Sequence, residues 1–185
     1  MNIAANSALP GEPLANSHTA ADVEAILLER SWLDASARVS ERAREWSARA
    51  AVLLGPQAAD RAELAELLSL CFHYDAVEIL RVPATHAVLA REGARTVIRE
   101  LALETIGGRP VDSDRFRSLI EAIKERVPYR SRMLFHPIRL ALTGRVGEGE
   151  LDRVILLLDE GAGAEGLACI KGVRQRMLEF CRAFE

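Results

Sequence analysis

The chain has 185 residues, of which 49% are hydrophobic and 28% are charged, and its formal net charge is −3. This balance is typical of a globular protein and argues against a polyanion-binding protein whose whole surface is basic. No stretch of about eighteen residues is continuously apolar, and residues 1–20 lack the basic start and apolar run of a secretory signal. Cys71, Cys169 and Cys181 are an odd set within apolar helical patterns, which favours free core thiols in a reducing compartment. We therefore expect a cytoplasmic protein with no membrane-spanning segment.

Helical signals follow one another along nearly the whole chain. The first of them come after residues 1–18, which are predicted to be a flexible tail. Thr19 and Asp22 have the spacing of a capping box at the start of a helix. A second helix, ended by Gly55-Pro56, is indicated by apolar side chains at intervals of three or four residues: Val39, Ala43, Trp46, Ala50 and Leu53.

The middle of the chain predicts four more helices. Asp60 is placed to cap the first of them, and Pro83 divides residues 72–89 into the next two. The fourth has apolar side chains at helical spacing between residues 94 and 105, and the Gly107-Gly108 pair ends it. Residues 107–110 are the candidate boundary, so we predict one helical subdomain over residues 19–108 and a second over residues 109–185.

The second predicted subdomain begins with a helix capped by Asp112 or Ser113. Pro137 suits the first turn of the next helix, and Gly144 suits its left-handed end. A short helix around residues 151–158 precedes the glycine-rich break DEGAGAEG at residues 159–166. The last helix is expected to carry on one side Leu167, Ile170, Met177, Cys181 and Phe184. Since no segment shows the alternation of a strand, the predicted fold class is all-α.

The sequence shows no convincing set of catalytic residues. It has no glycine-rich loop ending in Gly-Lys-Ser/Thr, and DEGAGAEG follows no predicted strand, so a linker between helices is the better interpretation. His73, Asp75 and His86 could gather a metal ion across two helices, but ordinary surface or core positions are favoured. The carboxylate pairs that could serve acid–base catalysis lie next to glycine in expected solvated loops: Asp159 with Glu160, and Glu148 with Glu150. We therefore expect no cofactor and no metal, and a small helical enzyme is the least favoured alternative.

Basic charge is concentrated in one part of the chain. Residues 109–145 hold nine basic and four acidic residues, whereas residues 1–108 hold ten basic and fifteen acidic ones. An exposed arginine cluster is a typical phosphate-binding surface, because a guanidinium group can hold phosphate with two hydrogen bonds. The arginines that we expect to bind RNA are Arg126, Arg130, Arg132, Arg139 and Arg145. For Arg139, a structural ion pair is an alternative of equal weight to RNA binding.

Residues 134–151, LFHPIRLALTGRVGEGEL, resemble the C-terminal part of bacterial glutamyl-tRNA synthetases. That family has a Leu-(Phe/Tyr)-x-Pro-(Leu/Ile)-Arg-(Leu/Ile)-Ala-(Leu/Val)-Thr-Gly run, which is followed shortly by Gly-Pro-Glu-Leu. Residues 134–144 match the run, and Phe116 stands where the family's preceding helix opens with an aromatic residue. The resemblance covers about residues 112–158. The chain departs from it in lacking the proline of Gly-Pro-Glu-Leu and in having DEGAGAEG where the family has a short Leu-Gly turn.

The resemblance implies two packed helical subdomains similar to the helical cage that binds the anticodon in these class I enzymes. The H-I-G-H-like and K-M-S-K-S-like signatures of the catalytic domain are missing from these 185 residues. The resemblance therefore implies a freestanding tRNA-binding module that acts in translation without forming aminoacyl-adenylate by itself. Its expected partners are tRNA-Glu or tRNA-Gln, and a separate synthetase or other protein.

The alternative is a protein-interaction or regulatory module that kept the fold and lost RNA binding. The acidic balance of residues 1–108 favours this alternative, because that region would repel tRNA. Surface charge distinguishes the two hypotheses. Scattered, ion-paired arginines would favour a protein partner, whereas RNA would be favoured by one continuous positive groove that joins Arg130, Arg132 and Arg145 to Lys171, Arg174 and Arg176.

Overall fold

A computed structural model describes residues 18–34 and 40–184, and within these ranges the regular elements are helices. One isolated β-bridge joins Leu33 to Leu167. The predicted all-α fold is confirmed. In chain order the helices are α1 (Ala20–Glu29), α2 (Glu41–Leu54), the 3₁₀ turn η1 (Gly55–Gln57), α3 (Arg61–Phe72), α4 (Ala76–Arg81), α5 (Pro83–Leu89), α6 (Ala94–Thr105), α7 (Ser113–Arg126), α8 (Ser131–Thr143), α9 (Gly149–Ala162) and α10 (Val173–Phe184).

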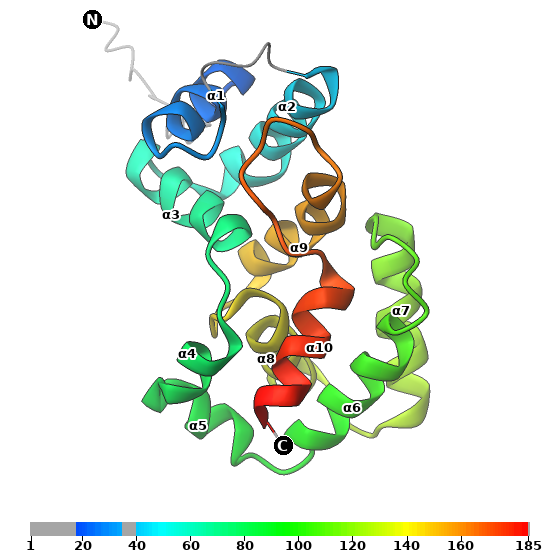
Figure 1. Ribbon diagram of the computed structural model, residues 1–185. Helices are drawn as coiled ribbons and strands as arrows, with labels where there is room; N and C mark the ends of the chain where they lie inside the picture. Colours follow the sequence, from blue (N-terminus) through cyan, green and yellow to red (C-terminus); the bar gives the residue numbers. More distant parts are fainter. Residues whose placement is uncertain (1–17, 35–39, 185) are drawn as a thin grey trace, which may run out of the picture.

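The helices form two groups that meet along α9 and α10 (Figure 1). In one group α1, α2 and α3 pack together, and α9 lies against α2 and α3. In the other group α6 and α10 pack on α8, α4 packs on α10, and α7 lies along α6. Helices from the second half of the sequence thus complete both groups, and one hydrophobic core runs from Trp46 through Leu142 to Phe180. The subdomain boundary at residues 107–110 stays a prediction.

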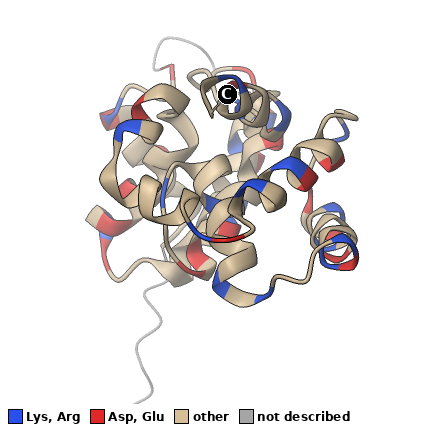
Figure 2. Cartoon of the chain, turned by 90° about the horizontal axis from the view of Figure 1, so that it is seen from below, with Lys and Arg blue, Asp and Glu red and all other residues tan. Residues whose placement is uncertain are grey.

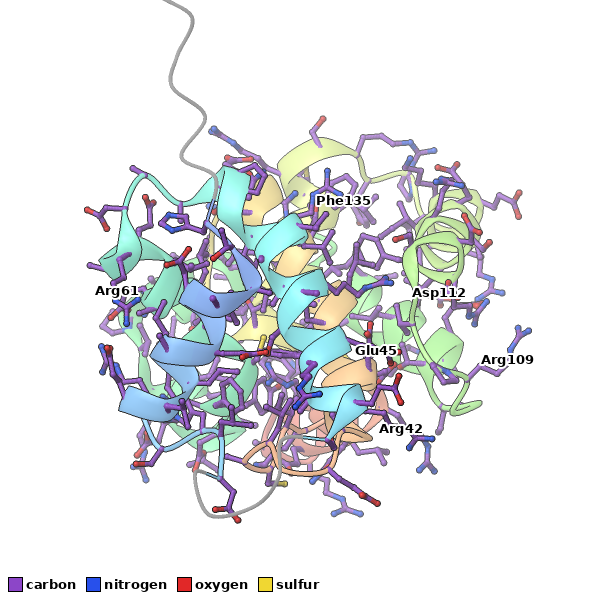
Figure 3. The ribbon with its side chains drawn as sticks, turned by 90° about the horizontal axis from the view of Figure 1, so that it is seen from above. Arg42, Glu45, Arg61, Arg109, Asp112 and Phe135 are labelled. Atoms are coloured by element: carbon purple, nitrogen blue, oxygen red, sulfur yellow. The ribbon has the colours of Figure 1, made fainter. Side chains whose placement is uncertain are left out.

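Local capping signals place several helix ends where the sequence predicts them. Thr19 and Asp22 form the capping box of α1. Asp60 caps α3, and Asp112 caps α7 by accepting a hydrogen bond of 2.8 Å from the Arg115 N–H (Figure 3). Gly144 ends α8 with a φ of +74°, a left-handed conformation that a residue with a Cβ rarely adopts.

Pro137 lies inside α8, so the prediction that it occupies the first turn is wrong. The helix begins at Ser131, in the segment just before the proline. Pro137 lacks the N–H that would bond to the Met133 carbonyl, but Met133 lies near the exposed start of the helix. Because nearly every side chain from Leu134 to Thr143 is buried, tertiary packing holds the helix together across the proline.

The glycine-rich break is also shorter than predicted, since α9 continues through Asp159 to Ala162. The Asp159 carboxylate is partly buried rather than fully solvated, and it accepts hydrogen bonds of 2.7 Å from the Val111 N–H and 2.8 Å from the Val173 N–H. Asp159 therefore joins the link before α7 to the start of α10. Leu167 and Ile170 precede α10 and do not share its face, which is a second correction.

None of the three cysteines forms a disulfide, as predicted, but only Cys71 is a buried core thiol. Cys169 is exposed in the link before α10, and Cys181 is partly buried. Residues 1–17 of the predicted tail, and Val39 of the second predicted helix, lie outside the described residues. Among the described helices, none has the length and apolar character needed to cross a bilayer.

Arg176 on α10 is fully buried at the junction of the two groups. Its guanidinium donates hydrogen bonds of 2.6–2.9 Å to the backbone carbonyls of Leu70, Cys71, Leu142 and Lys171. Three of these carbonyls lie in the last turns of α3 and α8, where helical carbonyls lack partners within the helix. Arg176 thus joins α10 to the C-terminal ends of α3 and α8, which are the negative ends of those two helix dipoles.

Tyr74 completes this cluster. Its ring lies 4.6 Å from the Arg176 guanidinium carbon, and its hydroxyl donates to the Ala141 carbonyl at 2.5 Å. Burial lowers the pKa of Arg176, whereas it raises the pKa of Tyr74 and raises that of Cys71 to about 12. The phenol and the thiol therefore stay neutral, and the positive charge is held by backbone dipoles and by the face of an aromatic ring.

Replacing Arg176 with Met should destabilise the protein strongly. The variant removes the donor from four carbonyls, of which three are buried and that of Lys171 is partly buried, and each hydrogen bond to a charged group contributes about 1.5–3 kcal/mol. We expect the free energy of unfolding, measured by urea denaturation, to fall by about 3 kcal/mol or more. Arg174→Met, an exposed change on the same helix, should alter it by less than about 0.5 kcal/mol. Equal losses in the two variants would contradict the role assigned to Arg176.

Candidate nucleic-acid interface

The arginines that the sequence assigns to RNA lie on α7, on α8 and in the links beside them. Arg126 belongs to the last turn of α7, and its guanidinium lies 3.3 Å from the Glu100 carboxylate and 2.8 Å from the Glu104 carboxylate. Both acidic residues belong to α6. Their hydrogen bonds raise the pKa of Arg126. Arg126 therefore joins α7 to α6 while about half of its side chain stays exposed.

Arg130 folds back onto the end of α7. Its guanidinium donates to the backbone carbonyls of Lys124 at 3.1 Å, Val127 at 2.8 Å and Tyr129 at 2.8 Å. A cation at a helix C-terminus satisfies free carbonyls and interacts favourably with the helix dipole. The contacts of Arg130 are thus those of a helix cap.

Arg132 and Arg145 are the most exposed members of the set, with 75% and 62% of their side chains accessible. Arg132 lies 3.3 Å from the Glu148 carboxylate, and Arg145 lies 3.6 Å from that of Glu66. Exposed ion pairs of this kind contribute only about 0–1 kcal/mol. Both guanidinium groups can therefore exchange their carboxylate partner for another anion at little cost.

Arg139 is buried and forms the structural ion pair that the sequence left as an alternative. Its Nε and Nη2 atoms donate to the two Asp152 carboxylate oxygens, each at 2.8 Å, and Nη1 donates to the Gly147 carbonyl at 2.9 Å. Burial opposes the charge, but the hydrogen bonds with Asp152 and the negative charges of Asp152, Glu148 and Glu150 together outweigh it and raise the pKa of Arg139. This bidentate pair holds α8 against α9.

The positive excess of residues 109–145 is matched in space by acidic residues from other parts of the chain. Figure 2 shows basic and acidic positions close together on the ribbon rather than separated onto two faces. Four of the five candidate arginines form ion pairs with carboxylates of α3, α6, α9 or the residue before α9. These arginines are Arg126, Arg132, Arg139 and Arg145, and the carboxylates are those of Glu66, Glu100, Glu104, Glu148 and Asp152.

The last helix does not extend this surface as the RNA hypothesis requires. Arg176 is buried, and the Lys171 ammonium group, just before α10, lies 2.7 Å from the Glu179 carboxylate. Arg174 is exposed and donates to the Ile106 carbonyl at 3.2 Å. The arginines are therefore individually partnered, which is the arrangement that favours a protein partner in the sequence argument.

His136 is a polar residue of this region that the sequence argument left without a role. It is only 8% exposed, and the Arg91 Nη1 atom lies 3.0 Å from its Nδ1 atom. Because a guanidinium group only donates hydrogen bonds, Nδ1 is the acceptor and Nε2 carries the proton. Nε2 is buried and has no hydrogen-bond partner among the described residues, and the Glu148 carboxylate lies 4.0 Å away.

Burial lowers the pKa of His136, and the positive charges of Arg91, Arg139 and Arg132 lower it further, against the opposing effect of Glu148. The imidazole is therefore neutral near pH 7. The sequence could have shown that Arg132, His136 and Arg139 share a helix face, since they stand at positions i, i+4 and i+7. It could not have shown Arg91, which reaches the site from the turn after α5.

His73, Asp75 and His86 are not brought together into a metal site. Within the described residues, no three His, Cys, Asp or Glu side chains have positions that could hold a metal ion. Asp75 instead caps α4, accepting from the Val77 N–H at 2.9 Å and the Glu78 N–H at 3.1 Å.

Two curated proteins are similar to part of this chain. Glutamate–tRNA ligase 1 of Halorhodospira halophila is 48% identical over 44 residues, which are 24% of this chain and 9% of the ligase. Glutamate–tRNA ligase 1 of a Chelativorans species is 37% identical over 67 residues, which are 36% of this chain and 14% of the ligase. The matched segments thus span less than a sixth of either relative. No family model matches the chain, and no solved structure matches it.

Lowering the pH should destabilise the protein through His136. Its pKa in the folded state lies below the value of about 6.5 for an unfolded chain, so the unfolded state takes up the proton first. This contribution to stability is present above about pH 6.5 and is lost as the pH falls through the folded pKa. We expect urea denaturation at pH 7 and pH 5 to show a smaller loss for His136→Gln than for the wild type. His86→Gln, a change at an exposed histidine, should behave like the wild type.

Proposed function

From the partial similarity to glutamate–tRNA ligases, we propose that this chain is a helical module that binds tRNA. The observation that carries the proposal is the 48% identity over 44 residues to a protein whose name specifies tRNA as its substrate. The proposed ligands are tRNA-Glu and tRNA-Gln. No chemical step of aminoacylation is assigned to these 185 residues.

Arg132 and Arg145 are the residues best suited to contact RNA, since both are largely exposed and each is held by a weak surface ion pair. Arg126 is half-exposed and adds a further guanidinium at the end of α7. Trp32 and Trp46 are buried, so neither offers a face on which a base could stack. We therefore assign the contacts to backbone phosphates, which position an RNA without reading its sequence.

Arg130 and Arg139 have a supporting role in this proposal. Arg130 caps α7, and Arg139 fixes α8 against α9, so together they hold the elements that carry the exposed arginines. Removal of Arg130 would weaken RNA binding by disturbing the scaffold rather than by removing a phosphate contact. A stability measurement separates these two causes.

A second candidate is a protein-interaction module that has kept the fold and lost RNA binding. The pairing of the arginines with carboxylates of the same chain favours it, because no continuous positive groove runs to the last helix. In such a module the ion pairs act only to hold helices together. The two candidates differ in one measurable property, the affinity for tRNA.

Filter binding to tRNA-Glu and tRNA-Gln across a salt series tests the proposal. We expect a Kd in the micromolar range or tighter at low salt, and log K should fall linearly with log salt because counterions are released. Arg132→Ala and Arg145→Ala should each weaken binding and reduce the salt slope by about one. Arg117→Ala is the matched control, since Arg117 is 73% exposed and is paired with Asp114 outside the predicted set. Absence of binding even at low salt would refute RNA binding and favour the protein-interaction module.

A further inference from the structure

Three donors on one face of α8 converge on a single carboxylate. The Glu148 carboxylate lies 3.3 Å from Arg132, 3.6 Å from Arg139 and 4.0 Å from the His136 Nε2 atom. Arg91 supports the group from behind, with its guanidinium 3.0 Å from the His136 Nδ1 atom. We call the four donors Arg91, Arg132, His136 and Arg139 the α8 cradle.

The Glu148 carboxylate fits this cradle loosely. Charge-assisted hydrogen bonds between nitrogen and oxygen are normally about 2.7–2.9 Å long, and all three Glu148 distances are longer than that. On the same guanidinium, Asp152 achieves two bonds of 2.8 Å. One carboxylate therefore does not satisfy the three donors, and an oxyanion that approached them more closely would form stronger hydrogen bonds.

The buried Nε2–H of His136 is an independent sign that this site can accept an oxyanion. Buried donors are almost always hydrogen-bonded, and an unpaired one costs about 1–3 kcal/mol. Arg91 fixes the tautomer so that this proton points to the side of the ring where Glu148 stands. An oxyanion that moved closer than Glu148 would satisfy it.

Glu148 is placed so that it can leave. Its side chain is 62% exposed, and it lies at a bend just before α9, so it can rotate away without breaking helical hydrogen bonds. Its pair with Arg132 is a surface ion pair, which contributes about 0–1 kcal/mol. Asp152 stays in place and keeps Arg139 oriented when Glu148 has moved.

We propose that the α8 cradle is a phosphate site for one backbone phosphodiester of RNA, and that Glu148 occupies it as an internal competitor until RNA binds. The assignment to RNA rests on the proposed function. Arg132 and Arg139 supply the charge, and His136 supplies a neutral donor that completes the contact. The site adds His136 and Arg91 to two arginines, Arg132 and Arg139, that the sequence already assigns to RNA binding.

Glu148→Gln removes the competing charge and leaves the shape of the side chain. We expect this variant to bind tRNA about three- to fivefold more tightly in filter binding, in line with the loss of one surface ion pair. Arg132→Ala in the Glu148→Gln background should cancel the gain. Glu29→Gln is the matched control, since Glu29 is 64% exposed and is paired with Arg61 on α3 (Figure 3). This control also removes one carboxylate and frees one arginine, so it should bind tRNA as the wild type does.

A second measurement follows the imidazole directly. Nitrogen-15 spectra of the four histidines, with His136→Gln to identify the His136 signal, are recorded during titration with inorganic phosphate at constant ionic strength. We expect the His136 Nε2–H signal to shift, and to shift at lower phosphate concentration in Glu148→Gln than in the wild type.

The possible failures are distinguishable. If tRNA binds but Glu148→Gln and Glu29→Gln raise the affinity equally, or if His136 does not respond to phosphate, the cradle is refuted and the proposed function stands. If phosphate shifts His136 but tRNA does not bind at any salt concentration, the proposed function fails and the assignment to RNA fails with it.

Discussion

The buried guanidinium of Arg176 is the contact on which the arrangement of the two helix groups depends. Helices α3 and α8 both end at the junction, and each exposes carbonyl groups that their own hydrogen bonds cannot satisfy. Arg176 and Tyr74 donate hydrogen bonds to these carbonyls at one point. Arg176 also donates to the Lys171 carbonyl in the link before α10. A single cation thus closes two helix ends, and its hydrogen bonds go to backbone carbonyls, whose dipoles favour the positive charge.

The charged side chains of this protein act mainly by forming ion pairs that join one helix to another. Arg126 joins α7 to α6 and Arg139 joins α8 to α9, so the segment that is basic in sequence is nearly balanced in space. This balance changes how the partial similarity to glutamate–tRNA ligases is interpreted. The motif around Arg139 holds a core together, and contact with a partner falls to the exposed groups at its edge, above all Arg132 and Arg145.

The features that could be predicted from the sequence are those decided within one helical turn. Thr19, Asp60 and Asp112 each cap a helix with a side chain that reaches only three residues forward. Gly144 ends α8 because a left-handed residue is needed at that single position. The candidate arginines are likewise predicted from local charge density. Charge density in the sequence shows which side chains are basic, but it does not show which carboxylates lie beside them in the folded protein.

The sequence by itself determined the all-α class, most helix ends and the face shared by Arg132, His136 and Arg139. Only the tertiary structure decided that Pro137 lies inside a helix, that Asp159 accepts hydrogen bonds from two distant N–H groups and that Arg176 is fully buried. The physical reason is the distance along the chain over which each interaction acts. Caps and apolar periodicity act over three or four residues, whereas these features depend on groups far along the chain, such as the Leu70 carbonyl that Arg176 reaches. Packing of the whole molecule then outweighs the local preference of one residue.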